Sequence, residues 1–155
     1  MLSRFFKTAA VCIILMQLVA CQPQSQIEIK DLASHFSVMG QTSAELIIGQ
    51  IKYTGHEPDR LIKVESNIAD QVEIYLLKDS QIQLQENGLV LNPNQIYSSR
   101  LQNHQMIHLM LLGLKRPLVK GSQEEVTFYF EKTAPIIKKI LILDTPEGES
   151  HGHHH

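Results

Sequence analysis

Short stretches of alternating apolar and polar residues, separated by turn-forming residues, are the feature that most restricts the fold of this chain. A period of two is typical of strands that bury one face. Neither a convincing helix nor a long repeat is visible, so the sequence predicts one all-β domain, a sandwich or barrel of about eight or nine strands. We expect strands in residues 27–30, 44–53, 60–66, 72–77, 81–85, 89–91, 106–112, 125–131 and 139–143, with residues 31–40 open between strand and loop.

The first twenty residues have the order of a secretory signal peptide. Arg4 and Lys7 precede an apolar run that is too short for a comfortable membrane-spanning helix. The following Leu-Val-Ala-Cys, ending at Cys21, resembles the lipobox of bacterial lipoproteins. This resemblance implies cleavage before Cys21 and lipid on that residue, and Gln22 in place of Asp implies sorting to the outer membrane, facing the periplasm. The alternative is a plain secretory peptide with a chance cysteine.

The rest of the chain divides by composition into a tether, a domain and a tail. We expect a signal peptide over residues 1–20, the lipidated cysteine and a tether over 21–26, the β-domain over 27–143 and a flexible His-rich tail over 144–155. Loss of Arg4 and Lys7 leaves 12 basic against 16 acidic residues, which does not favour nucleic acid as a partner. Cys12 leaves with the signal peptide and Cys21 takes lipid, so no disulfide or catalytic thiol is expected.

One apolar run combines nitrogen and sulfur ligands. In a strand, His108 and Met110 point to the same face, and Met106 would join them. An imidazole beside thioethers suits Cu(I) better than a hard cation. The alternative is a buried strand in which methionine only fills the core.

Three segments resemble the PCu(A)C-type periplasmic copper chaperone family. They are residues 51–61, residues 72–75 and, most specifically, residues 108–118, which nearly repeat the family's H-x-M-L-x-G-L-K-x-P-L. The resemblance implies a single-domain Greek-key β-sandwich of cupredoxin-like kind. It also implies Cu(I) carriage in the periplasm for a copper-accepting protein such as a cytochrome c oxidase subunit.

The sequence departs from that family at two ligand positions. At the family's spacing from His108 and Met110, the first His falls on Tyr75 and the first Met on Glu86. A phenol and a carboxylate are poor ligands for Cu(I). We therefore expect a weakened site made by His108 and Met110. Possible substitutes for the lost ligands are His35, Met39, His104 and Met106.

The chain ends in a histidine cluster that has three interpretations. It can be a native metal-collecting tail, part of a purification tag, or an inert solvated end. A native tail would favour Cu(II) or Zn(II) over Cu(I). Its imidazoles belong to His151, His153, His154 and His155.

Together these features predict a lipid-anchored copper-binding protein or copper chaperone, attached to the membrane through Cys21. The alternative is a β-sandwich lipoprotein that lost its metal and acts as a binding or structural module. No enzyme is expected, because no triad or phosphate loop can be identified. We interpret Asp59-Arg60 as a turn and surface ion pair, and Glu124-Glu125 as a solvated strand entry.

Overall fold

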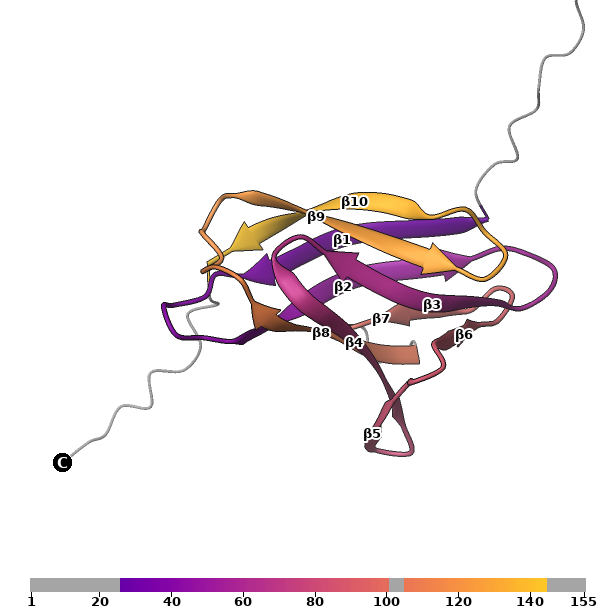
Figure 1. Cartoon of the computed structure of the whole chain (residues 1–155). Coiled ribbons are helices and arrows are strands. Elements are labelled where there is room, and N and C mark those ends of the chain that lie inside the picture. The colour runs from indigo at the N-terminus through magenta and orange to yellow at the C-terminus, as the bar shows by residue number, and fades with distance from the viewer. Residues whose placement is uncertain (1–25, 101–104, 145–155) are drawn as a thin grey trace, which may run out of the picture.

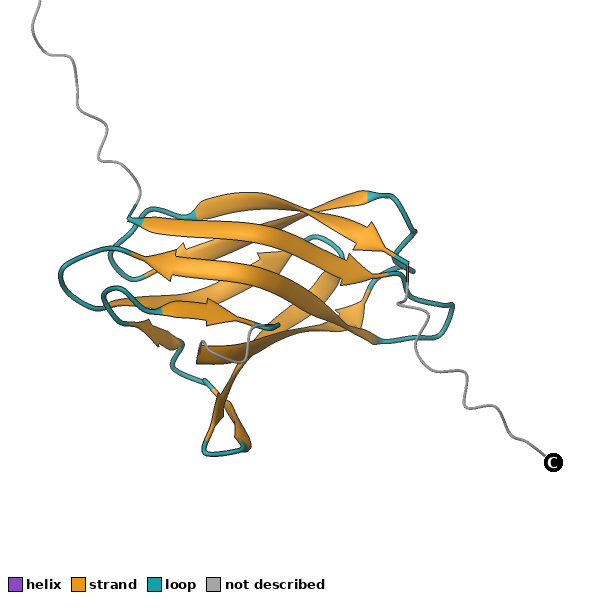
Figure 2. Ribbon diagram, turned by 180° about the vertical axis from the view of Figure 1, so that it is seen from behind, coloured by secondary structure: helices purple, strands orange, loops and turns teal. Residues whose placement is uncertain are grey.

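The computed structural model describes residues 26–100 and 105–144, and in these ranges the chain is built of strands and loops (Figures 1 and 2). Ten strands form within the described residues; nine of them match the predicted alternating runs, and β7 is additional. Their bounds are β1 Ile27–His35, β2 Ser43–Tyr53, β3 Asp59–Ser66, β4 Ala69–Lys78, β5 Gln81–Leu84, β6 Leu89–Leu91, β7 Ile96–Ser98, β8 Gln105–Leu114, β9 Gln123–Phe130 and β10 Ile136–Leu143.

The strands form one strongly curled sheet with the order β5-β4-β8-β7-β2-β1-β10-β9-β3-β6, and β8 also pairs directly with β2. Curling folds the sheet into two facing layers, one around β4, β8 and β2 and the other around β10, β9 and β3 (Figure 1). Most neighbouring strands are not consecutive in the chain, as in a Greek key. The predicted all-β, cupredoxin-like sandwich is therefore confirmed.

The core lies between the two layers and is built by the inward positions of each alternating strand. The largest wholly buried side chains come from both layers, which is the packing that a two-layer sandwich requires. They include Leu46, Ile48, Ile51, Leu61, Tyr97, Ile107, Leu109, Leu111 and Phe128.

Asp31 interrupts the first strand, which then continues through the segment that the sequence left open. Its backbone has a φ of 53°, and its side chain covers Gly49 on the neighbouring β2. A Cβ at Gly49 would lie 2.5 Å from Asp31 Cβ, so only glycine fits beneath it. This pair allows β1 to run on to His35 beside β2.

The Asn87-Gly88 turn forms as predicted, but it does not join a hairpin. Gly88 has a φ of 81° and its N–H donates to Gln85 O at 2.9 Å. β5 pairs with β4, whereas β6 pairs with β3. The turn is therefore a corner at which the chain passes from one layer to the other.

Two acidic residues assigned to the surface are buried, and those two predictions were wrong. Asp59 is 2% exposed and its Oδ1 accepts hydrogen bonds from the backbone N–H groups of Arg60 and Lys132. Glu124 is 6% exposed, because it occupies an inward position of β9, and Arg116 pairs with it at 2.8 Å. Each carboxylate is stable there because it is fully hydrogen-bonded or paired.

No helix among the described residues has the length and apolar character needed to cross a membrane.

Candidate metal site

Strand β8 presents its predicted ligand residues on the outer face of the sheet. Ile107, Leu109 and Leu111 are wholly buried in the core, whereas Met106, His108 and Met110 alternate with them and are half-buried. The interpretation of this run as a strand is correct. The imidazole and the thioethers therefore lie outside the core. This burial pattern does not fit the alternative in which methionine only fills the core.

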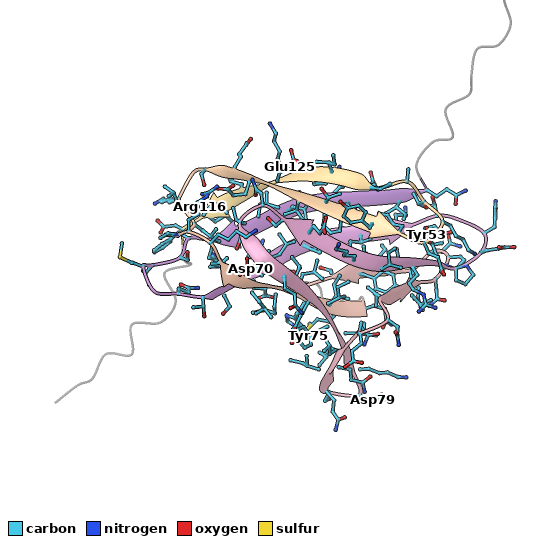
Figure 3. The ribbon with its side chains drawn as sticks, viewed as in Figure 1. Tyr53, Asp70, Tyr75, Asp79, Arg116 and Glu125 are labelled. Atoms are coloured by element: carbon cyan, nitrogen blue, oxygen red, sulfur yellow. The ribbon has the colours of Figure 1, made fainter. Side chains whose placement is uncertain are left out.

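The neighbouring strands place three oxygen-bearing side chains on the same face. On β4, Tyr75 pairs with His108 and Glu73 pairs with Met110. On β2, Glu45 pairs with Met110 from the other side. Side chains of directly paired residues share one face of an antiparallel sheet. His108 and Met110 are therefore flanked by a phenol and two carboxylates, and Figure 3 shows Tyr75 on this lower side of the molecule.

Glu45 holds the imidazole of His108. The Nδ1 atom of His108 lies 2.7 Å from Glu45 Oε1, and the two side chains are 27% and 39% exposed. A carboxylate only accepts hydrogen bonds, so Nδ1 carries the proton and donates it. In the neutral ring the lone pair then lies on Nε2. This carboxylate–imidazole pair is the arrangement that orients metal-binding histidines in proteins.

Glu45 is a functional candidate that the sequence reasoning missed. The signal was present, because Glu45 is an acidic residue in the apolar segment Ala44-Glu45-Leu46-Ile47-Ile48. Alternation predicts that it points away from the core. It does not reveal the partner, which lies 63 residues further along the chain.

Tyr75 is held in its neutral form by a hydrogen bond. Its hydroxyl donates to Glu73 Oε2, and this bond, helped by partial desolvation, raises the pKa of the phenol above its ordinary value. A phenol must lose its proton to become a good metal ligand. Tyr75 therefore stands directly opposite His108 without supplying a ligand at neutral pH.

The other predicted positions lie elsewhere or outside the described residues. Glu86 is exposed in the turn after β5. His35 ends β1, where its Nδ1 lies 2.8 Å from Asp144 O, and Met39 is 91% exposed in the following loop. Among the described residues, no hydrogen bond or ion pair joins these three side chains to His108. Predictions that fall outside the described residues concern Cys21, His104, His151, His153, His154 and His155.

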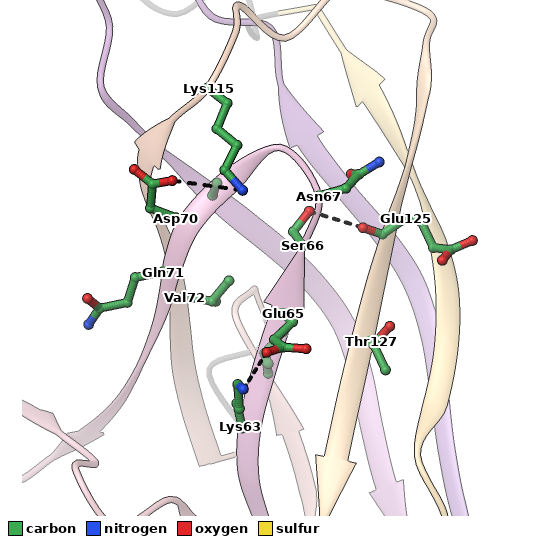
Figure 4. Close-up of a pocket in the computed structure, with 12 residues that line it drawn as sticks. Lys63, Glu65, Ser66, Asn67, Asp70, Gln71, Val72, Lys115, Glu125 and Thr127 are labelled. Carbon is green, nitrogen blue, oxygen red and sulfur yellow. Dashed lines mark hydrogen bonds and ion pairs between the residues drawn. The ribbon is translucent and has the colours of Figure 1, made fainter.

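A groove of about 570 Å³ lies on another part of the surface, between β3, β4 and β9 (Figure 4). Four of its charged side chains form two ion pairs, Lys63 with Glu65 and Lys115 with Asp70. Ser66 Oγ also donates to Glu125 O at 3.0 Å. In the described ranges, no three acidic, histidine or cysteine side chains are grouped so that they could hold a metal ion, in this groove or elsewhere.

Solved structures define the class of fold. The copper-bound PCuAC domain from PmoF2 aligns with a TM-score of 0.63 at 20% identity, covering 77% of this chain and 94% of that domain. The apo PCuAC domain from PmoF1 gives the same TM-score and identity over 95% of its length. The Cu(I) form of DR1885 from Deinococcus radiodurans aligns at 0.58 with 13% identity, covering 83% of this chain and 87% of that one. The protein thus has the PCuAC fold.

The family model is more specific. Residues 27–139 match the LpqE-like family, described as "Putative lipoprotein LpqE-like", and this protein belongs to that family. No curated protein matches the sequence.

Proposed function

We propose that this protein is an extracytoplasmic, lipid-anchored copper carrier that holds Cu(I) at His108 and Met110. Copper is the cargo, and His108 Nε2 and Met110 Sδ are the donors. The observation that carries the proposal is the hydrogen bond between Glu45 and His108 Nδ1, which leaves Nε2 available beside two thioethers. Imidazole and thioether donors favour Cu(I).

The position of these residues suits transfer rather than storage. His108 and Met110 are half-buried on the outer face of the sheet, so another protein can reach a bound ion directly. Met106, two residues before His108 on the same face, is the available third ligand. A site without the family's full ligand set would bind more weakly and release its cargo more readily.

The comparisons support the nature of the cargo and of the compartment. Two of the solved structures with this fold are described as copper-bound or CuI forms, and the family description names lipoproteins. With the lipobox at Cys21, these support outer-membrane attachment facing the periplasm. A copper-accepting protein such as a cytochrome c oxidase subunit is the proposed recipient. We propose a carrier and not an enzyme.

The C-terminal histidines would act separately from this site. Imidazole donors without thioethers favour Cu(II) or Zn(II), and binding would be lost as pH falls below the imidazole pKa of about 6.5. We propose that His151, His153, His154 and His155 collect metal in the periplasm.

A competition titration of the full chain with a Cu(I) chelator tests the carrier proposal. The variant His108→Ala/Met110→Ala is expected to lose at least about tenfold in Cu(I) affinity, equivalent to about 1.4 kcal/mol. A chain ending at Asp144 separates the contribution of the tail and should keep the core affinity. Equal affinity of parent and double variant in this shortened chain would remove the core site from the proposal.

One observation favours the alternative of a module that lost its metal. Tyr75 and Glu73 are hydrogen-bonded to each other and occupy the β4 side of the face, where a ligand would have to stand. On this alternative the shortened chain binds no Cu(I), and only the histidine tail takes up metal.

A further inference from the structure

The curled sheet has two edges, and they are protected unequally. β5 and β6 stand at the two ends of the strand order. The β4–β5 ribbon projects from the sandwich, with Asp79 at its tip (Figures 1 and 3). Asp79 and Ser80 both have positive φ angles, 52° and 62°, as a two-residue hairpin turn of the primed type requires. The ribbon is therefore a regular hairpin that presents β5 to the surroundings.

Hydrogen bonding fixes which backbone groups of β5 point outward. The N–H of Gln85, just after β5, donates to the carbonyl oxygen of Ile74 on β4 at 2.8 Å. Gln85 and Ile74 are therefore a hydrogen-bonded pair, and the backbone groups of Gln85 point toward β4. In an antiparallel ladder, hydrogen-bonded pairs alternate with non-hydrogen-bonded pairs. Gln83 and Gln81 are therefore the next residues along β5 whose backbone groups bond to β4. Ile82 and Leu84 consequently turn their N–H and C=O groups to the free edge. An edge of this kind is a template for another strand.

The opposite edge has a side-chain cap. The Tyr97 hydroxyl donates to Val90 O at 2.8 Å and accepts from Asn92 N–H at 3.0 Å, at and just after β6. β6 is also only three residues long. Nothing comparable covers β5 among the described residues. Its four residues contain no charge and no proline, the two usual devices that discourage edge pairing.

The side chains of β5 are apolar on one face. Ile82 is 61% exposed and Leu84 is 42% exposed. They pair with Leu77 and Tyr75 of β4, so they share the outer face that carries His108. Two large apolar side chains on an unprotected edge strand are costly to leave in water.

We propose that β5 pairs in antiparallel orientation with β5 of a second copy of this protein, about a twofold axis at Gln83. In this register Ile82 of one copy lies opposite Leu84 of the other, and Gln81 lies opposite Gln85. The outward N–H and C=O groups of Ile82 and Leu84 then bond to each other across the axis. The segment is its own complement, because it carries no charge that would repel its copy, and a twofold pairing closes without growing into a fibre.

Cysteine cross-linking in the otherwise unchanged chain tests the register. Gln83→Cys places two thiols directly opposite each other at the axis, within reach of a disulfide. Gln81→Cys is the matched control on the same strand and face, because its two copies lie about four residues, or roughly 13 Å, apart along the pair. Oxidation should give a disulfide-linked dimer with Gln83→Cys and at most a tenth as much with Gln81→Cys or the parent chain. Equal cross-linking at both positions would overturn the proposal.

Sedimentation of the full chain at about 100 µM tests the association itself, since this concentration populates dimers with micromolar Kd. Ile82→Lys introduces an edge charge and should lower the dimer fraction about tenfold. Ile137→Lys is the matched control, because Ile137 is also 61% exposed but lies on β10 inside the sheet. Circular dichroism verifies that each variant keeps its strands. A monomeric parent chain, or equal loss of dimer in both variants, would contradict the pairing.

Discussion

Glu45 on β2 and His108 on β8 are joined by a hydrogen bond of 2.7 Å between Oε1 and Nδ1. The bond crosses two strands that pair directly in the sheet, Glu45 standing opposite Met110. It determines which ring nitrogen is free, and so it sets the direction from which His108 can bind a metal ion. The carboxylate also stabilises positive charge that develops on the ring when Nε2 binds a cation.

The first prediction concerns Glu45→Gln. The amide is nearly the same size but carries no charge, so it holds the His108 imidazole less firmly. We expect Cu(I) affinity to fall about tenfold to a hundredfold, the usual cost of removing such a partner. A chelator competition titration of the chain ending at Asp144 measures it.

Glu28→Gln is the control for this change, because Glu28 is an exposed carboxylate that pairs with Lys30 on β1. It should leave the affinity unchanged. The role of Glu45 fails if Glu45→Gln binds Cu(I) as tightly as the parent chain does.

The second prediction concerns Tyr75→His with Glu86→Met, which restores the two ligands that the resemblance implies. Because Tyr75 pairs directly with His108, the new imidazole stands on the same face at the adjacent strand. We expect Cu(I) affinity to rise at least about tenfold, or 1.4 kcal/mol. Tyr75→Phe removes the bond to Glu73 without adding a ligand and should show no such rise. If the restored chain gains nothing over Tyr75→Phe, then Tyr75 and Glu86 are not the lost ligand positions.

The third prediction concerns acid stability and Asp59. Burial acts to raise the pKa of this carboxyl, but hydrogen bonds from the Thr133 hydroxyl and from the N–H groups of Arg60, Lys132 and Thr133 outweigh it, so the pKa is lowered. A lowered folded-state pKa gives stability that is fully present above the unfolded-state value near 4 and is lost as pH falls toward the folded-state value.

Asp59→Asn should therefore destabilise the fold at neutral pH by about 1–3 kcal/mol, because the amide cannot satisfy all these donors. Below about pH 4, the free energy of unfolding of this variant should also fall less steeply than that of the parent chain. Urea unfolding at several pH values measures both effects. Asp79→Asn, in the exposed β4–β5 turn, should stay within about 0.5 kcal/mol of the parent chain. Parallel pH profiles for Asp59→Asn and the parent chain would contradict the assignment.

The fourth prediction concerns the buried carboxylate of Glu124. Arg116 Nη2 lies 2.8 Å from Glu124 Oε2, and the Arg116 side chain is 50% exposed. Arg116→Ala leaves the carboxylate buried without its partner, but water can replace part of the guanidinium. We expect a loss of about 1–2 kcal/mol, below the 3–5 kcal/mol typical of fully buried pairs. Denaturant unfolding checks this, and Arg116→Ala combined with Glu124→Gln should recover part of the loss. An additive loss in the double variant would show that the two side chains are not coupled.

The strands were predictable where alternation reports burial directly. β8 and β9 are examples, because their inward residues are apolar, except Glu124, which was wrongly predicted to be solvated. β7 was not predicted, since Ile96–Ser98 is only three residues long and forms because β2 and β8 lie on either side of it. The pairing of β5 with β4 and not with β6 also depends on distant packing and leaves no local signal.

The site was predictable in the same restricted sense. The spacing of His108 and Met110 determines that they share a face, and that part is correct. Glu45 and Glu73 reach that face only through the register of three strands, which the sequence of any one strand does not specify. Sequence reasoning could therefore identify candidate ligands on one strand, but not the side chains that neighbouring strands place beside them.

X-ray absorption at the copper edge, on the chain ending at Asp144 loaded with one equivalent of Cu(I), tests the central claim most directly. The account predicts scattering from one imidazole nitrogen and from one or two thioether sulfurs, with the sulfur contribution reduced in Met110→Ala and the imidazole contribution lost in His108→Ala. A first shell of nitrogen and oxygen alone, or one that both substitutions leave unchanged, would contradict the assignment of Cu(I) to His108 and Met110.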